Sequence, residues 1–490
     1  MKKIISIFLS FVLILSVFPI TSFGATSGDF TYTVVSETDK TCKVTAYNGS
    51  SKDVVIPAEL NGYKVTAIEI LTFYMNKALS VHLPATVSSL NGQAFNEMNS
   101  TVNNITVAED SPYYSSVNGV LYNKDKTSLV CYPAGKSDEI YTVLDGVELI
   151  EYYSFTSSLN LKEIILPASL KTIDDWAFNN CKALTKINLP DGLVSIGASA
   201  FRTCRALEEV SVPDSVTFID VAAFYNCSGM KAITLSNNTE TIYRGTFSGC
   251  SSLKKITIPQ SVKTILSQAF YGCDSLTEVI IPNNVTVLED AFHECDGLER
   301  VILSENLTTL ESFTFNGCDA LKTVVIPSSI VNIEEKVFYN CKDYLIVCDD
   351  NTVAKTYCLN NTISYILNSE VTQIDLASSR IYRYATGEKT SDIVLGSDDI
   401  TCSAEKLHPG TGVVLSIMKN GTLHSQYTLV VNGDVDGDSA VDVIDASIVA
   451  LAANNLATLE DEYFLAADTN ADEEITAEDY AQVVNLVLAE

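Results

Sequence analysis

The stretch that decides the fold is LKKITIPQSVKTILSQAFYGC, which runs from Leu253 to Cys273. The same pattern recurs along most of the chain, and a Phe three residues before a Cys marks its register. Successive marks are 23 residues apart, and once 22: Phe178, Phe201, Phe224, Phe247, Phe270, Phe292, Phe315 and Phe338, with Cys181, Cys204, Cys227, Cys250, Cys273, Cys295, Cys318 and Cys341. A fixed period in the twenties predicts a solenoid, because a single unit buries its apolar edge only when neighbours stack on it.

Each unit opens with a short β-rich run that ends at proline, such as LKEIILP (161–167) or LKTVVIP (321–327). We expect one strand there and a second strand in the run that follows, such as SVKTI. The Ala-Phe pair then begins a few residues that we expect to form a single helical turn before the Cys. Stacking these units predicts an α/β solenoid whose strands form parallel sheets.

The first strand has an inner and an outer face. Inward positions such as Leu161, Ile164 and Leu166 never become charged. One outward row nearly alternates in sign: Glu163, Lys186, Glu209, Ala232, Lys255, Glu278, Arg300 and Thr323. Neighbouring opposite charges stabilise a sheet by a few tenths to about 1 kcal/mol per pair, which favours a ladder of ion pairs, with a ligand site as the alternative.

A second outward row ends in the apolar residues Ile280, Ile302 and Val325. They form either a patch that meets a partner or a set of scattered apolar residues on a β surface.

The repeat resembles the BspA-like class of bacterial leucine-rich repeat, whose pattern is close to LxxIxIPxSVxxIxxxAFxxCxxL. The match covers about residues 50 to 345, with Leu, Ile, Pro, Ala-Phe and Cys at the right offsets. The resemblance implies extracellular binding or adhesion, without shared catalytic residues and without a single common ligand. An unknown protein or glycan on the repeat face is the partner that it implies.

The chain divides into four regions by pattern. Residues 1–24 carry Lys2 and Lys3 before an apolar run and end in small residues, which predicts a signal peptide and a secreted protein, with no other membrane span. Residues 25–367 form the predicted solenoid. We expect its first hairpin, within 25–60, to cap the array. Residues 368–431 predict a small β module or linker, and residues 432–490 form the C-terminal domain.

The solenoid contains an insertion, because Phe95 and Phe155 are 60 residues apart where two periods would take 46. Two β-rich runs about NKDK predict an inserted hairpin at about 109–145. Its tyrosines are Tyr113, Tyr114, Tyr122 and Tyr132. They are able to stack on sugars, or to pair across the strands of the hairpin itself.

Charge and cysteine content narrow the classes of function. The formal net charge is −30, and residues 432–490 hold 15 acidic residues and no Lys or Arg. This distribution argues against a nucleic acid partner and for a cation. Eight of the thirteen cysteines recur at one inward repeat position, which predicts a stack of buried free thiols rather than bridges. Cys348 and Cys358 remain a candidate pair.

The C-terminal region carries two twelve-residue loops with calcium-loop spacing. Oxygen ligands stand at positions 1, 3, 5, 9 and 12, and a backbone carbonyl serves at position 7. The first set is Asp434, Asp436, Asp438, Ala440, Asp442 and Asp445, and the second is Asp468, Asn470, Asp472, Glu474, Thr476 and Asp479. Hard oxygen ligands select Ca²⁺, so the spacing predicts two calcium ions, with an acidic solvated tail as the alternative.

An apolar helical pattern follows each loop, at 443–453 and 478–488, so the arrangement is loop-helix twice. Duplicated loops that end in Asp resemble a type I dockerin over about residues 433–489. The resemblance implies calcium-dependent docking onto a cohesin of a scaffoldin, as in cellulosomes that degrade polysaccharides. In that family loop positions 10 and 11 help choose the partner. These positions are Val443 and Ile444 in the first half, Ala477 and Glu478 in the second.

The two halves differ, which predicts one preferred docking orientation. In it, Val443, Ile444 and Leu451 make an apolar contact with the cohesin. The alternative for these apolar residues is packing between the two helices of the domain.

These observations predict a secreted, non-catalytic interaction protein, located near the cell surface through a scaffold. A dockerin-borne enzyme is the rival class, but GxSxG, HExxH and P-loop motifs are absent from the sequence. His293 lies two residues before Cys295, a core position of the repeat, which disfavours a Cys-His nucleophile. A third hypothesis is an independent surface adhesin whose calcium loops only stabilise the C-terminus.

Overall fold

The computed structural model describes residues 24–96, 100–342, 344–349, 352–361 and 363–367, and strands at 373–375, 380–384, 400–402, 413–419 and 422–432. The described residues belong to two compact units. The first unit lies within residues 1–239 and 245–250, and the second within 240–244 and 251–490. Each unit is described by itself below.

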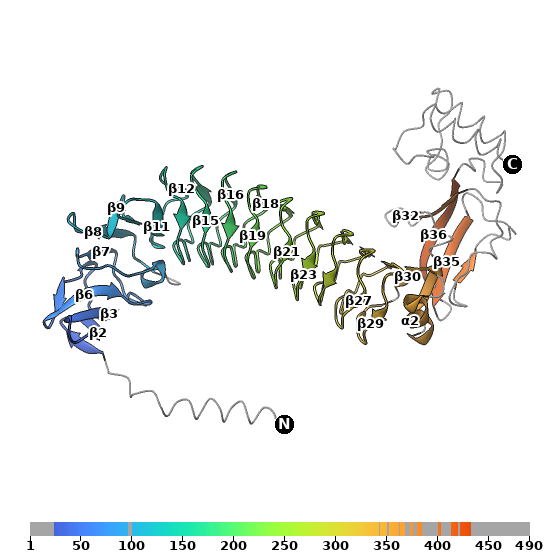
Figure 1. Cartoon of the computed structure of the whole chain (residues 1–490), viewed down its shortest axis with the longest axis horizontal. Helices are drawn as coiled ribbons and strands as arrows, with labels where there is room; N and C mark the ends of the chain where they lie inside the picture. The colour runs from blue at the N-terminus through green and yellow to red at the C-terminus, as the bar shows by residue number, and fades with distance from the viewer. Residues whose placement is uncertain are drawn as a thin grey trace, which may run out of the picture. The chain divides into compact units, whose positions relative to one another are not determined.

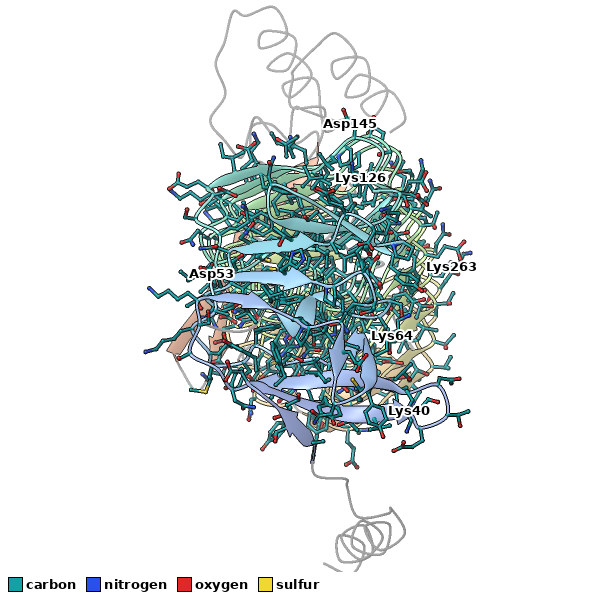
Figure 2. All side chains as sticks on the ribbon, turned by 90° about the vertical axis from the view of Figure 1, so that its left-hand side faces the viewer. Lys40, Asp53, Lys64, Lys126, Asp145 and Lys263 are labelled. Atoms are coloured by element: carbon teal, nitrogen blue, oxygen red, sulfur yellow. The ribbon has the colours of Figure 1, made fainter. Side chains whose placement is uncertain are left out.

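The first unit begins with a five-stranded cap (Figure 1). Strands β1 (Ala25–Ser27), β2 (Phe30–Ser36) and β3 (Thr41–Tyr47) run antiparallel to one another, as the alternating sequence predicts. Strand β6 (Tyr63–Ile68) pairs parallel with β3, and β5 (Glu59–Leu60) lies at the edge. The cap presents charged side chains such as Lys40 and Lys64 on its surface (Figure 2), a polar covering that a solenoid end requires.

The early repeats contain a parallel sheet of β4 (Asp53–Val55), β7 (Ser80–Leu83) and β8 (Asn104–Val107). A short 3₁₀ helix, η1 (Gly92–Ala94), precedes Phe95. The segment in which we expected an inserted hairpin forms three antiparallel strands, β9 (Tyr114–Val117), β10 (Val120–Asn123) and β11 (Ser128–Cys131). Strand β11 also pairs parallel with the next repeat strand, β13 (Leu149–Ile150). The insertion therefore extends a sheet of the solenoid.

Regular repeats follow in the first unit, each with two strands (Figure 1). The first strands pair parallel as β12 (Ile140–Thr142), β14 (Glu163–Ile165) and β16 (Lys186–Asn188), and as β18 (Glu209–Ser211) with β20 (Ala232–Thr234). The second strands continue from β13 through β15 (Thr172–Ile173) and β17 (Ser195–Ile196) to β19 (Phe218–Ile219).

The second unit contains the same repeat. Its first strands are β22 (Lys255–Ile256), β24 (Glu278–Ile280), β26 (Arg300–Ile302) and β28 (Thr323–Ile326). Its second strands are β21 (Thr241–Ile242), β23 (Thr264–Ile265), β25 (Val287–Leu288), β27 (Thr309–Leu310) and β29 (Asn332–Ile333). The parallel sheet continues from β28 to β30 (Leu345–Cys348) and β31 (Ser364–Leu367), with helix α2 (Val353–Asn361) between them in sequence.

The Ala-Phe segment differs from the expected helical turn, because it is a series of tight turns. Two residues of most of these segments have a left-handed backbone, for example Trp176 with φ 57° and Asn180 with φ 62°, whereas the shorter repeat around Phe292 has one, Glu294 with φ 55°. Alternate amides donate to the next repeat, as the Phe178 amide does to the Ala200 carbonyl at 2.7 Å, while the amides between them donate three residues back. Left-handed residues interrupt an α-helix, and the inter-repeat bonds replace its hydrogen bonds.

The core repeats from rung to rung. The marker Phe rings stack face to face with centroids about 5 to 6 Å apart, as in Phe178–Phe201 (5.1 Å) and Phe292–Phe315 (5.7 Å). The inward positions Leu161 and Ile164 are 1% exposed, which confirms the predicted inner face, while Leu166 is half-buried. The apolar edge of one repeat is therefore covered by the next repeat, as the period predicts.

Five strands, placed between residues 373 and 432, form one further sheet in the order β32-β33-β36-β35-β34. Their bounds are β32 (Gln373–Asp375), β33 (Arg380–Tyr384), β34 (Ile400–Cys402), β35 (Val413–Lys419) and β36 (Thr422–Asn432). The predicted signal peptide through Phe23 and both calcium loops lie outside the described residues. In the part of the chain that is described, no helix is long and apolar enough to cross a membrane.

Candidate functional site: outer surfaces of the repeats

The outer face of the first strands carries two ion pairs of the expected ladder. Glu163 stands opposite Lys186 in the register of β14 and β16, and their side chains pair at 2.6 Å. Arg300 and Glu278 pair in the same way at 3.1 Å in the second unit. Thr323, the last member of the row, is buried instead, because Leu345 of the added strand β30 stands opposite it.

A second ladder lies at the residue directly before each first strand. Lys162 pairs with Glu139 at 2.7 Å, Lys231 with Glu208 at 2.8 Å, and Lys322 with Glu299 at 2.9 Å. Sequence reasoning missed this row because it considered only residues inside the strands. Comparing the preceding position across repeats would have revealed it. Both rows join neighbouring repeats by ion pairs, each of which stabilises the stack by a small amount because the side chains are largely exposed.

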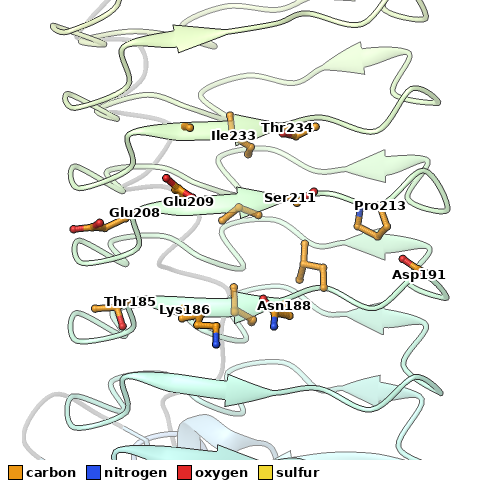
Figure 3. A pocket seen from close by; sticks show the side chains of 14 residues that line it. Thr185, Lys186, Asn188, Asp191, Glu208, Glu209, Ser211, Pro213, Ile233 and Thr234 are labelled. Carbon is orange, nitrogen blue, oxygen red and sulfur yellow. The ribbon is translucent and has the colours of Figure 1, made fainter.

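An open groove of about 690 Å³ lies on the outer face of the first unit, across β16, β18 and β20 (Figure 3). Its middle is a row of small uncharged polar side chains, Asn188, Ser211 and Thr234, all exposed. Lys186 and Glu209 flank this row on one side, as Figure 3 shows. Such a groove offers hydrogen-bonding groups in an extended line.

The corresponding groove of the second unit measures about 260 Å³ and includes Lys255, Thr257, Glu278 and Ile280. Ile280 is 53% exposed, whereas Ile302 and Val325 are only half-exposed. The predicted apolar patch is therefore centred on a single well-exposed side chain.

The tyrosines of the insertion are mostly internal, so the sugar-stacking alternative is wrong for two of them. Tyr122 and Tyr132 are at most 1% exposed, and the Tyr132 hydroxyl donates to Asp138 at 3.0 Å. The Tyr114 hydroxyl donates to the Ser88 carbonyl at 3.3 Å, and Tyr113 alone is well exposed, at 46%. The insertion uses its tyrosines to join the core, because large rings gain most from burial against other rings.

The repeated cysteines form the predicted stack of free thiols. Thiols along the stack donate to the carbonyl of the marker Phe one repeat earlier, as Cys204 does to Phe178 at 3.2 Å and Cys318 to Phe292 at 3.2 Å. Burial raises the pKa of the Cys250 and Cys295 thiols to about 12, because the thiolate is poorly solvated there. Cys348 and Cys358 are free as well, and no bridge joins them.

The arrangement around His293 does not make a nucleophile. The His293 Nε2 atom lies 2.6 Å from the Asn316 side-chain amide, while the Cys295 thiol is buried and donates to the Phe270 carbonyl at 3.0 Å. In the described part of the chain, no three His, Cys, Asp or Glu side chains gather in a way that would hold a metal ion. All the predicted calcium ligands and cohesin contacts lie at 434–479, outside the described residues.

Several solved structures of bacterial proteins resemble parts of this chain. A leucine-rich repeat protein from Bacteroides ovatus shares 23% identity, with 66% of this chain and 71% of that chain covered and a TM-score of 0.40. One from Eubacterium ventriosum shares 25% identity over 59% and 64% of the two chains, with a TM-score of 0.34. A leucine-rich cell surface protein from Faecalibacterium prausnitzii shares 21% over 64% and 95%, with a TM-score of 0.30. No curated protein matches the chain.

Two family models match different parts of the chain. Residues 432–488 match the type I dockerin domain, a calcium-binding type of domain. The BspA type leucine-rich repeat region matches in six copies over residues 46–119, 137–245 and 219–345. The repeat match covers more than half of the sequence, and its register agrees with the stacked strands, free thiols and Phe rings described above. The chain therefore belongs to the BspA-type leucine-rich repeat family and carries a type I dockerin domain at its C-terminal end.

Proposed function

We propose that this chain is a secreted, non-catalytic interaction protein whose repeats present binding surfaces and whose dockerin attaches it to a cohesin of a scaffoldin. The observation that carries the proposal is the combination of a BspA-type repeat array with a type I dockerin in one chain. The outer faces of the repeats support a binding role, because they offer open grooves lined by hydrogen-bonding groups. Such surfaces suit a protein or glycan partner in a polysaccharide-degrading complex outside the cell.

Calcium holds the dockerin together in this proposal. The first loop gathers five aspartates around one point, and their mutual repulsion opposes closure until a dication neutralises it. One ion enters each loop, so the domain takes two ions. Asp445 and Asp479 supply the final oxygen ligands, where a calcium loop of the helix-loop-helix kind has a bidentate Glu.

The docking contact centres on the first loop-helix half. Val443 and Ile444 occupy the partner-selecting positions of that half, and Leu451 follows two turns further along the predicted helix. The equivalent positions of the second half hold Ala477 and Glu478, which are smaller or charged. An apolar cohesin surface therefore prefers the first half, and one docking orientation dominates.

The test is a pull-down of the full chain on a panel of immobilised type I cohesins, with calcium or with a chelator. We expect capture by at least one cohesin in calcium and none in chelator. The double variant Val443→Asp, Ile444→Asp should lose capture, because it places two carboxylates in an apolar contact. The matched control Ala477→Asp, Glu478→Asp alters the second half and should retain it.

Two results would contradict the proposal. The first is undiminished capture of the Val443→Asp, Ile444→Asp variant. The second is failure of every cohesin while the same chain binds cells or fibres, which would favour the independent adhesin. Hydrolysis of a polysaccharide by the purified chain would instead favour the enzyme.

A further inference from the structure

A column of aromatic rings with one cation lies along the Ala-Phe turns of the first unit. The Tyr153 and Trp176 rings stack with centroids 5.6 Å apart and an interplanar angle of 3°. The Arg202 guanidinium continues the column, 5.6 Å from the Trp176 ring and 4.1 Å from the Tyr225 ring. Tyr152 packs edge-on against Tyr153 at 4.4 Å and is 37% exposed. Four successive repeats contribute to this column, which lies on the turns and not on the strand face that carries the groove.

Arg202 is held by rings alone. Its guanidinium makes no ion pair and donates no hydrogen bond to any residue that the structure describes. The acidic side chains of the adjacent turns are engaged with the backbone, since Asp175 accepts from the Ala198 amide and Asp220 from the Val221 amide, each at 2.7 Å. In a chain with net charge −30, a half-buried arginine without a carboxylate partner is unexpected.

The geometry favours a planar anion at this place. The contacts with the Trp176 and Tyr225 rings restrict the orientation of the guanidinium, and they leave its N–H donors available for a ligand. A planar fork of donors matches a carboxylate, which it binds by two parallel charge-assisted hydrogen bonds. The rotamer entropy that an exposed arginine would lose on binding is already reduced by the ring contacts.

The rings distinguish among carboxylate ligands. Trp176 and Tyr225, which contact Arg202, and Tyr153, which lies beyond Trp176 in the column, are each partly exposed. Tyr153 stacks on the Trp176 ring and the Arg202 guanidinium lies over it, so a sugar ring meets the exposed edges of the aromatic rings, whose hydroxyl and indole N–H groups are able to bond its hydroxyls. An aspartate or glutamate side chain of a peptide has no comparable ring to fill the column edge. A uronic acid joins both features, since it carries a carboxylate on a sugar ring.

We propose that Arg202 and the rings around it form a binding site for a uronic acid unit of an acidic polysaccharide. Arg202 binds the carboxylate, and Trp176 and Tyr225 contact the sugar on either side of it. This site does not depend on calcium or on docking to a cohesin. Its failure would leave the proposed attachment untouched, and failure of the attachment would leave this site untouched.

The chain carries its own reporter for the test, because Trp176 is its only tryptophan. Titrating the full chain with oligogalacturonate should change the Trp176 fluorescence in a saturable way, and calorimetry should give the same affinity. Fully methyl-esterified oligogalacturonate, which lacks the carboxylate, should bind roughly tenfold more weakly or worse. Added salt should weaken the binding of the free oligogalacturonate and leave the binding of the esterified form unchanged, because only the free form carries a charge.

Variants separate the site from general charge. Arg202→Gln should reduce the affinity roughly tenfold or more, and Arg202→Lys should recover only part of it, because lysine keeps the charge but lacks the fork. Arg205→Gln is the matched control, since Arg205 is an exposed arginine of the same repeat without a ring contact, and this variant should bind like the original chain. Circular dichroism melts of all three verify folding.

The proposal is overturned if esterified and free oligogalacturonate bind equally, or if Arg202→Gln binds like the original chain while folded. It is also overturned if poly-glutamate of matched length binds as tightly as oligogalacturonate, because the ligand would then be an acidic peptide. The absence of any response from the folded chain to saturating oligogalacturonate overturns it as well.

Discussion

Phe224 illustrates how one residue type holds the stack together. Its ring lies between the rings of Phe201 at 5.3 Å and Phe247 at 5.9 Å, and its side chain is fully buried. Truncating it removes contacts within its own repeat and with both neighbours. Each repeat depends on its neighbours for burial, so a cavity here weakens two interfaces.

We expect Phe224→Ala to lower the free energy of unfolding by about 3–5 kcal/mol, the usual cost of deleting a buried ring. Phe218→Ala is the matched control, because Phe218 is 39% exposed, and its cost should stay within roughly 1 kcal/mol. Urea denaturation followed by circular dichroism measures both. Equal destabilisation by the two variants would contradict the account of the Phe stack.

The thiol column makes a prediction about pH. Burial raises the pKa of Cys250 and Cys295 to about 12, whereas an unfolded cysteine ionises near pH 8.5. The folded state therefore binds more protons between these two values, so the stability that the thiols contribute is present below about pH 8.5 and is lost as pH rises towards about 12. At pH 8 the buried column should resist a thiol-specific reagent such as DTNB in the native chain and react fully in urea.

The absorbance of the reacted reagent counts the accessible thiols. The double variant Cys250→Ser, Cys295→Ser is the control: it should show two fewer reactive thiols in urea and the same number of reactive thiols in the native chain. Rapid labelling of the native column at pH 8 would contradict the burial of these thiols.

At the scale of the element, the Ala-Phe turn is the part of the repeat that depends on unusual backbone geometry. Ala222 has φ 56°, and the equivalent residue of the next repeat is Gly245 with φ 64°. A left-handed conformation costs a non-glycine residue roughly 1 kcal/mol. The stack maintains it because the amides of the turn bond the next repeat, as Phe224 does to Thr246 at 3.0 Å.

We therefore expect Ala222→Gly to be neutral or to stabilise the chain by up to roughly 1 kcal/mol, since glycine adopts this φ without strain. The adjacent control Ala223→Gly should destabilise it, because Ala223 is fully buried and its methyl group packs in the core. Differential scanning calorimetry of both variants gives the comparison. A clear loss of stability in Ala222→Gly would show that the turn is not strained.

The strands were predictable from the sequence, and the turn was not. An inward residue such as Ile164 recurs at a fixed offset and is apolar every time, so its burial follows from the period. The first left-handed position of the turn is held by residues such as Trp176, Ala222 and Gly245, which share no side-chain property that a pattern would reveal. The second position is Asn or Gly in six of the eight marked repeats, as in Asn180 and Gly249, so it carried a local signal that sequence analysis missed.

The column around Arg202 also escaped sequence analysis. Trp176 and Arg202 occupy different positions of successive repeats. Trp176 lies two residues before its marker Phe178, and Arg202 directly follows its marker Phe201. Their contact depends on the path of the turn and is invisible to a comparison of equivalent positions. The strand ladder of Glu163 and Lys186 was visible because both occupy the same position.

At the scale of the whole molecule, charge separates the roles of the regions. Opposite charges on neighbouring repeats form ion pairs along the stack, as Lys231 and Glu208 do. Residues 432–490 contain 15 acidic residues without one Lys or Arg to pair with, and calcium is the partner that their loop spacing selects. In the proposed function, the repeats therefore supply the binding surfaces and the acidic domain supplies a metal-dependent attachment.

Native mass spectrometry of the full chain with its cohesin tests this division most directly, because one spectrum reports both the partner and the metal. We predict a one-to-one complex that carries two calcium ions and disappears when a chelator removes them. A complex that forms equally well without bound calcium, or no complex with any type I cohesin in calcium, would contradict the account.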